Sequence, residues 1–302
     1  GSPIFDRSTS PIGLTPSGEV YIDAIEKLFA LEQNTINQLN NLNGLLTGKL
    51  SIGGTIFFTS FILPGILGEF SRKYPQIKIE LIEGTTSQLT DKLMGEELDL
   101  IIDNSELDDK NYEKYYYNTE RIILAVPKEF EINKELKEYQ LTSADIRNRL
   151  HRDDDFPALP LPLLKNTPFI FVKEENSIYK RGVKMCSRQN YTPNITLKPD
   201  QVVSAFNMAG KGIGATFIPD ALVESLSYEV PLCYYKMEES LAVRQVYFYK
   251  KRNKYLTKTM EEFIRVAVGD EGFQKVREAR EKENQEKKSQ EKRYGAKNTG
   301  SL

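Results

Sequence analysis

The 302-residue sequence contains little of the chemistry on which most enzymes and secreted proteins depend. It has a single histidine, His151, and two cysteines, Cys186 and Cys233. Two cysteines cannot form a disulfide framework in a chain of this size, which favours a reducing compartment such as the cytoplasm. The sequence also has no G-x-S-x-G motif, no P-loop and no histidine and cysteine cluster with zinc spacing. We therefore expect no enzyme activity, no cofactor and no metal.

Long apolar runs and an excess of one charge are missing as well. No stretch approaches the roughly 20 apolar residues that span a bilayer, and no basic segment followed by an apolar run indicates a signal peptide. Lysine and arginine number 41 and aspartate and glutamate 43, which gives a net charge of -2. A chain without overall basic character binds nucleic acid only through a local surface. We expect a soluble cytoplasmic protein without a membrane partner.

The few groups with reactive or ligand-binding side chains are better explained by structure. His151 lies in a polar segment and is predicted to be solvated, whereas Cys186 and Cys233 lie on elements that would bury them. The three aspartates at 153–155 are typical of a solvated loop. The glycines of G-K-G-I-G at 210–214 precede a strand and so favour a tight turn over a dinucleotide site.

One long helix is predicted near the start of the chain. Thr15 is a good N-cap, Pro16 suits the first helical position, and no proline follows before Asn43. Gly44 and Gly48 would end this helix of about 28 residues, or about 42 Å. Apolar side chains recur along it at steps of three, four or seven residues: Ile22, Ile25, Phe29, Ile36 and Leu39. This pattern favours pairing with a second copy, although docking of the helix on its own domain remains an alternative.

After this helix, short β-rich runs alternate with helical segments, which is typical of an α/β fold with parallel strands. Strands are predicted at 49–54, 77–84, 98–103, 121–127, 168–172, 194–198, 212–219, 230–235 and 243–251. Helices are predicted at 62–75, 87–98, 177–190, 200–210, 220–227 and 256–268. Residues 128–166 are expected to form a loop with one short helix.

The repeated order suggests two lobes between which the chain crosses twice, at 121–127 and at 213–219. Open α/β sheets bind ligands at the carboxyl ends of their strands, and free N–H groups at helix starts favour an anion. The candidate ligand-binding residues are Gly54, Thr55, Thr59, Ser60, Asp103, Asn104, Asn176, Ser177, Gln201, Thr216 and Ile218. As an alternative, Thr59, Ser60 and Ser177 would only cap helices.

Several motifs together give the sequence a family likeness. In order they are I-F-D-R, L-T-P-S-G, G-K-L-S-I-G, E-L-D-L-I-I and A-G-K-G-I-G-A-T-F-I-P, between residue 3 and about residue 268. This order resembles that of LysR-type transcriptional regulators. The resemblance implies a winged helix-turn-helix, a long linker helix and a two-lobed effector domain of the type II periplasmic-binding-protein fold.

The resemblance also implies a division of this chain. It comprises a remnant of the DNA-binding wing at 1–15, a linker and dimerisation helix at 16–47, lobe I at 48–126 and 219–268, lobe II at 127–218, and a charged, disordered tail at 269–302. Arg7 and Ser8 would approach DNA, while the recognition helix would precede this sequence.

The functional hypothesis is therefore a ligand-responsive LysR-type regulator. It would bind DNA and a small, anionic effector and form a homodimer or homotetramer. The alternative is a stand-alone solute-binding protein, or an enzyme, of the same two-lobed fold.

Overall fold

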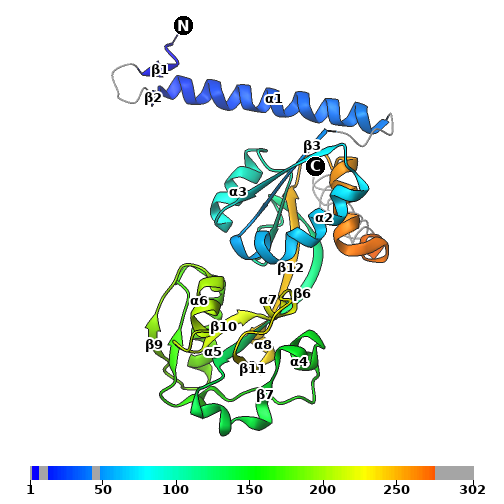
Figure 1. Ribbon diagram of the computed structural model, residues 1–302. Coiled ribbons are helices and arrows are strands. Elements are labelled where there is room, and N and C mark those ends of the chain that lie inside the picture. The colour runs from blue at the N-terminus through cyan, green and yellow to red at the C-terminus, as the bar shows by residue number, and fades with distance from the viewer. Residues whose placement is uncertain (1, 7–12, 43–47, 276–302) are drawn as a thin grey trace, which may run out of the picture.

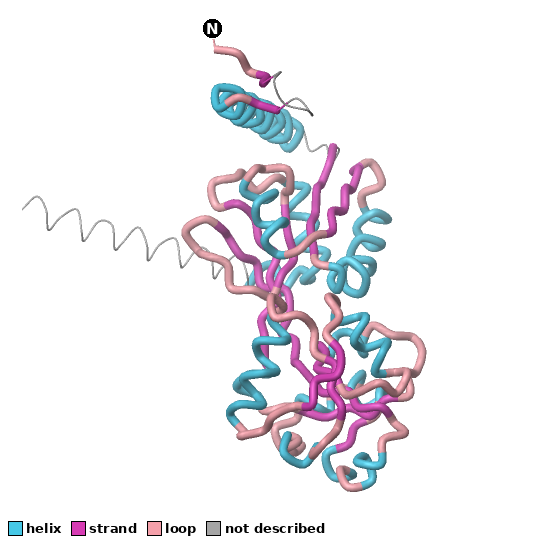
Figure 2. Tube along the Cα trace, turned by 90° about the vertical axis from the view of Figure 1, so that its left-hand side faces the viewer, coloured by secondary structure: helices cyan, strands magenta, loops and turns pink. Residues whose placement is uncertain are grey.

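The computed structural model describes residues 2–6, 13–42 and 48–275. A long helix lies across the end of a body made of two α/β lobes (Figure 1). The lobes are joined by extended strands, which the view in Figure 2 shows running through the junction. Within the described residues, no helix is both long enough and apolar enough to cross a membrane.

The N-terminal part consists of a strand pair and the long helix. Strands β1 (Phe5–Asp6) and β2 (Gly13–Leu14) are antiparallel, and helix α1 spans Pro16–Leu42. The predicted cap is present, since the Gly18 N–H donates to Thr15 Oγ1 at 3.0 Å. A Cβ at Gly18 would lie 2.0 Å from the carbonyl oxygen of Ile4, so only glycine allows the strand pair to pack this closely on the helix. Arg7 and Ser8 lie outside the described residues.

Lobe I contains a parallel sheet covered by helices. Strand β3 (Gly48–Gly54) pairs with β4 (Ile77–Glu83) and with β5 (Leu100–Asp103), both in parallel. The connections are the π-helical turn η1 (Phe58–Ile62) with α2 (Leu63–Lys73), and α3 (Thr86–Met94). The inner strands β3 and β5 are mostly buried, whereas the edge strand β4 alternates apolar residues with more exposed charged ones. Leu50, Ile52 and, on α2, Phe70 are fully buried.

Lobe II contains shorter strands and more turns. Its strands are β7 (Gln140–Leu141), β8 (Pro168–Ile170), β9 (Asn194–Leu197), β10 (Thr216–Pro219) and β11 (Leu232–Lys236). Its α-helices are α4 (Ser143–Arg147), α5 (Ser177–Arg188), α6 (Val202–Ala209), α7 (Asp220–Glu224) and α8 (Glu239–Ala242). Its 3-10 turns are η2 (Glu131–Lys134), η3 (Lys137–Tyr139), η4 (Leu150–Arg152) and η5 (Leu161–Leu164). The segment 128–166 is thus more ordered than a loop, because its apolar side chains, including Leu141 and Leu161, are buried.

Two long antiparallel strands connect the lobes, β6 (Tyr112–Pro127) and β12 (Val243–Lys251). The second crossing was expected at 213–219, but β10 pairs with the lobe II end of β6, and β11 beyond it pairs with β7. In lobe I, β12 pairs with β5 on the side opposite β3. Residues 220–242 therefore lie with lobe II, and the chain returns to lobe I in β12.

A C-terminal helical segment, residues 258–275, packs on lobe I. The ring of Phe263 lies 5.2 Å from that of Phe70, edge to face. The charged tail was expected to begin at residue 269. The helical segment instead continues past Gly269, which has a positive φ of 75°, and Phe273 is buried beneath the guanidinium of Arg265. Residues 276–302 lie outside the described residues.

Candidate functional site

A buried ion pair lies where the two crossing strands meet. Glu120 on β6 and Arg244 on β12 are cross-strand partners, and Arg244 Nη2 lies 2.7 Å from Glu120 Oε1. Both side chains are only 2% exposed. Asn104, after β5 of lobe I, donates from Nδ2 to Glu120 Oε1 at 2.8 Å. Arg244 Nη1 donates to the hydroxyl of Ser177, at the start of α5 in lobe II, also at 2.8 Å. These four residues form a continuous polar connection between the lobes.

The electrostatics of this pair are those of charged groups removed from water. Burial raises the pKa of Glu120; the charge of Arg244 opposes that rise, and nearby Asp220 adds to it. Arg181 on α5 donates to the carbonyl oxygen of Leu241 at 2.8 Å. Burial and the charge of Arg244 lower the pKa of Arg181. Two guanidinium groups therefore lie close to one carboxyl group whose ionisation is disfavoured.

Two atoms of the pair have unused hydrogen-bonding capacity. Glu120 Oε2 and Arg244 Nε are buried and have no hydrogen-bond partner among the described residues. One is an acceptor and the other a donor, and a buried polar atom without a partner costs about 1–3 kcal/mol. A small molecule bearing both kinds of group would satisfy them.

The other candidate residues of lobe I have their polar contacts within that lobe. The Thr59 hydroxyl donates to Glu83 Oε2 at 2.8 Å, and Thr59 lies inside η1, so it is not a helix cap. Asp103 accepts from the Thr86 hydroxyl at 2.8 Å. The remaining candidates are Gly54 at the end of β3, Thr55 just after it, and Ser60, exposed on η1. Among the described candidates of lobe I, only Asn104 hydrogen-bonds to the central pair.

At the start of α5, one candidate residue caps the helix and the next one contacts the ion pair. Asn176 is the cap, because its side chain accepts from the Ile178 N–H at 2.9 Å. Ser177 is not a cap in this structure, since its hydroxyl accepts from Arg244.

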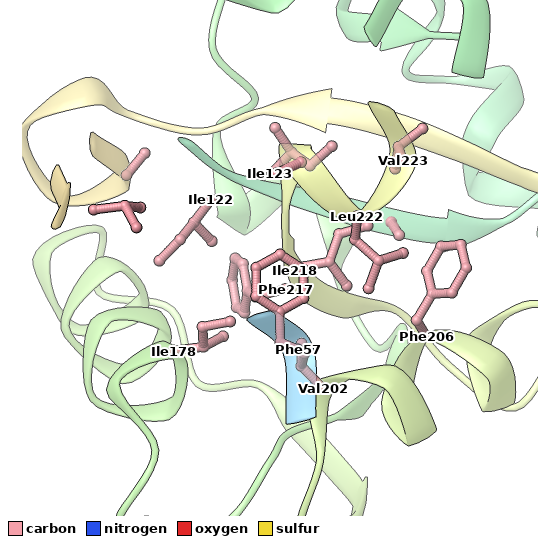
Figure 3. Packing of buried hydrophobic residues seen from close by; sticks show 14 of the residues in the cluster. Phe57, Ile122, Ile123, Ile178, Val202, Phe206, Phe217, Ile218, Leu222 and Val223 are labelled. Atoms are coloured by element: carbon pink, nitrogen blue, oxygen red, sulfur yellow. The ribbon is translucent and has the colours of Figure 1, made fainter. Parts of the chain in front are cut away.

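The last three candidates are Gln201, Thr216 and Ile218, and they do not contact the ion pair through a hydrogen bond among the described residues. Gln201 precedes α6 without capping it, and Thr216 and Ile218 are buried in β10. A narrow, mainly apolar crevice lies beside β10, and it encloses almost no space the size of a water molecule. It is lined by Ile170, Phe171, Val172, Ile178, Tyr179, Thr216 and Phe217. Thr216 thus lines this crevice, whereas Ile218 is part of the core between the lobes (Figure 3).

Sequence reasoning missed the central residues, Glu120 and Arg244. A signal was present in each case, because a charged residue directly adjoins a strand-forming run: T-E-R-I-I-L-A-V and V-R-Q-V-Y-F. Charged residues in buried strands are rare unless they are paired. The pairing itself could not be read from the sequence, because the partners are 124 positions apart.

A second buried cluster surrounds His151 on η4. His151 was predicted to be solvated, and this prediction is wrong: its side chain is 0% exposed, and Nε2 lies 2.8 Å from Asp220 Oδ2. Arg152 Nη2 lies 2.7 Å from the same oxygen and 3.1 Å from Glu224 Oε1. Burial alone would raise the pKa of Asp220, but the contacts from His151 and Arg152 and the N–H of Arg121 outweigh it and lower that pKa.

The same cluster has the residue types of a metal site. His151, Asp220 and Glu224 each offer a ligand atom, and these atoms lie within 4.8 Å of one another. The guanidinium of Arg152 already contacts both carboxylates and balances their charge. A cation would have to displace it, so the geometry favours a structural role for the cluster.

Comparisons with known proteins agree with this fold. The family model described as the LysR substrate binding domain matches residues 43–270. The chain is 25% identical over 268 residues to the uncharacterized HTH-type transcriptional regulator YcgK of Bacillus subtilis (strain 168), covering 88% of this chain and 81% of the relative. It is 23% identical over 256 residues to the regulator AlsR of the same organism, covering 84% and 77%.

Among solved structures, full-length BenM is similar with a TM-score of 0.57 and 18% identity, over 89% of this chain and 83% of BenM. The effector binding domain of QuiR in complex with shikimate has a TM-score of 0.57 and 14% identity, over 74% and 96%. These likenesses confirm the two-lobed fold. Because the relatives are transcriptional regulators, the alternative of a solute-binding protein or an enzyme is not favoured. Because the family model spans more than half of the sequence, the chain belongs to the LysR family of transcriptional regulators, with the two lobes as its effector-binding domain.

Proposed function

We propose that the chain binds a small anionic effector between its lobes, beside Arg244, and that binding changes the spacing of the lobes. The observation that carries this proposal is the position of the Glu120–Arg244 pair. Asn104 reaches the pair from lobe I and Ser177 from lobe II. A ligand that changes these contacts therefore acts on both lobes at once.

The charges at the junction support an anionic effector. Arg181 and Arg244 provide two cationic groups against the single carboxyl group of Glu120. A carboxylate of the effector would accept charge-assisted hydrogen bonds from Arg244, including one from Nε, which has no partner among the described residues. Glu120 Oε2 would accept from a hydroxyl or amino group on the same molecule.

Helix α1 would carry the response to DNA by pairing with a second copy. Its apolar side chains have little cover, and Phe29 is 63% exposed and Ile36 41% exposed. Ile22 and Ile25 are half-buried, and Leu39 lies farther along the same helix. Exposed apolar groups on a helix without a packed partner favour an interface. We accordingly propose that α1 is a linker helix that forms a homodimer or a higher oligomer, and that the protein is cytoplasmic and binds DNA through the segment preceding α1. Residues 43–47, the end of the predicted linker helix, lie outside the described residues.

The structural neighbours lend support to this assembly. CbnR, solved in complex with its target DNA, is similar with a TM-score of 0.57 and 13% identity over 89% of this chain. Arg7 and Ser8, between β1 and β2, remain the predicted DNA contacts.

A thermal-shift screen against amino acids and carboxylic acids tests the effector site. A ligand that binds only the folded state raises the unfolding temperature. We expect an anionic compound to stabilise the wild-type chain and to lose this effect in Arg244→Gln. Arg188→Gln is the matched control, because Arg188 is an exposed arginine on α5. If the compound raises the unfolding temperature of Arg244→Gln as much as that of Arg188→Gln, the ligand binds elsewhere.

A further inference from the structure

Phe57 is an aromatic side chain of lobe I that lies in the apolar core between the lobes. It follows β3 and immediately precedes η1, yet it is only 6% exposed. It belongs to one buried apolar cluster with Phe217, Ile218 and Ile178 of lobe II, and Figure 3 shows it on a lobe I segment that enters this cluster. The turn η1, which follows Phe57 in lobe I, contacts α7 of lobe II. This part of lobe I therefore reaches across the junction.

The crevice beside β10 and the charged pair both involve the first turn of α5, whose Ile178 belongs to the same apolar cluster as Phe57. Ile178 and Phe217 line the crevice and also belong to the cluster drawn around Phe57. Ser177, the residue before Ile178, accepts the hydrogen bond from Arg244. The first turn of α5 thus joins an apolar crevice to a guanidinium group.

The backbone after Phe57 is suited to moving this ring. In η1 the Leu63 N–H donates to the carbonyl oxygen of Phe58, five residues earlier, so the turn contains one more residue than an α-helical turn. Such π-helical turns occur often at functional sites. Conversion to an α-helical turn would rotate the preceding residues by about 100° around the helix axis, because an α-helix has 3.6 residues per turn. Phe57 would then leave the junction without unfolding of α2.

We propose that Phe57 fills the place at the lobe junction that a ring of the effector would take, and that the effector is a carboxylic acid with a ring or a body of similar size. The ring of the effector replaces that of Phe57, and its carboxylate binds Arg244. In the unliganded chain, Phe57 joins the lobes and competes with the effector. This inference rests on the proposed function, because it needs the anionic site at Arg244.

Benzoate is a suitable probe because it combines one ring with one carboxylate. Its affinity is measured by isothermal titration calorimetry for the full chain and for Phe57→Ala. Acetate serves as the carboxylate without a ring, and benzyl alcohol as the ring without a carboxylate. Phe70→Ala is the matched control, since it removes the same ring from the fully buried core of lobe I, away from the junction.

We expect benzoate to bind Phe57→Ala at least about tenfold more tightly than the wild type, because the ring of the protein no longer competes. Acetate should show no gain, and Phe70→Ala should bind benzoate as the wild type does. Phe57→Leu, which keeps more apolar contact and so protects folding, should show a smaller gain in the same direction.

Three results would overturn the proposal: equal benzoate affinity in the wild type and Phe57→Ala, an equal gain in Phe70→Ala, or no benzoate binding by any of these proteins. The combination of Phe57→Ala with Arg244→Gln separates this failure from that of the proposed function. A gain that survives the loss of Arg244 contradicts the anionic site. Equal affinities that still depend on Arg244 contradict only the role of Phe57.

Discussion

Replacing Arg244 with methionine should destabilise the chain strongly, because it leaves the carboxyl group of Glu120 buried without its cation. Both side chains are 2% exposed, and the guanidinium supplies the shortest contact to Glu120, at 2.7 Å. Loss of one partner from a buried ion pair costs about 3–5 kcal/mol, whereas replacing both partners by apolar residues of similar size is about neutral. We therefore expect a large loss for Arg244→Met and a much smaller one for Glu120→Leu combined with Arg244→Met.

Urea denaturation at pH 7, followed by circular dichroism, measures these free energies of unfolding. The exposed pair Lys134–Glu131 is the control, with side chains 72% and 81% exposed. Its Lys134→Met variant should cost less than about 1 kcal/mol, as is usual for surface pairs. A cost of that small size for Arg244→Met, or a double variant as unstable as the sum of the single ones, would refute the inference that the junction is a low-dielectric environment.

Three further predictions concern pH, packing and assembly. The pKa of Glu120 is raised above its ordinary value of 4.5, so the folded state holds this proton more tightly than the unfolded state does. The free energy of unfolding should therefore fall as the pH rises from about 4.5 through the folded pKa. Glu120→Gln should remove this fall in a series of urea midpoints measured from pH 4 to 8. Gly53→Ala should destabilise the fold by about 1–3 kcal/mol in thermal unfolding, since its Cβ would lie 2.7 Å from Leu89 Cδ2. Gly65→Ala on α2 meets no atom within 4 Å and should stabilise the fold by about 0.5–1 kcal/mol. The reverse order would contradict the packing described. Phe29→Asp on α1 should lower the oligomeric state measured by analytical ultracentrifugation, and an unchanged mass would argue against pairing through this face.

Much of lobe I could be predicted because its elements are local in sequence. The strands β3, β4 and β5 are short β-rich segments separated by helical ones, and the helices between them end at clear signals such as Pro75. The family likeness then supplied the two-lobed fold, which the comparisons confirm.

The parts that could not be predicted depend on contacts between distant residues. The second crossing was placed at β10 because an apolar run there looks like any other buried strand, and only its pairing with β6 shows that it stays in lobe II. His151 was expected in solvent because the segment around it is polar. Its burial depends on Asp220, which lies 69 positions later.

In the candidate site, too, the residues at the ends of local elements could be predicted and the contact between distant residues could not. Asn104 and Ser177 were found because they follow or begin predicted elements, and the structure brings both to one ion pair. The pair itself was missed, since periodicity marks which residues are apolar and does not show which buried charges face one another.

The measurement that tests the account most directly is the distance between the lobes with and without an effector. Cysteines at exposed positions Glu69 on α2 and Lys184 on α5 can carry a fluorescent donor and acceptor, because Cys186 and Cys233 are buried and burial raises the pKa of both thiols. A stabilising anion from the thermal-shift screen should change the transfer efficiency in the wild type and leave it unchanged in Arg244→Gln. A saturating effector that leaves the wild-type distance unaltered, or alters it equally without Arg244, would contradict an effector site between the lobes.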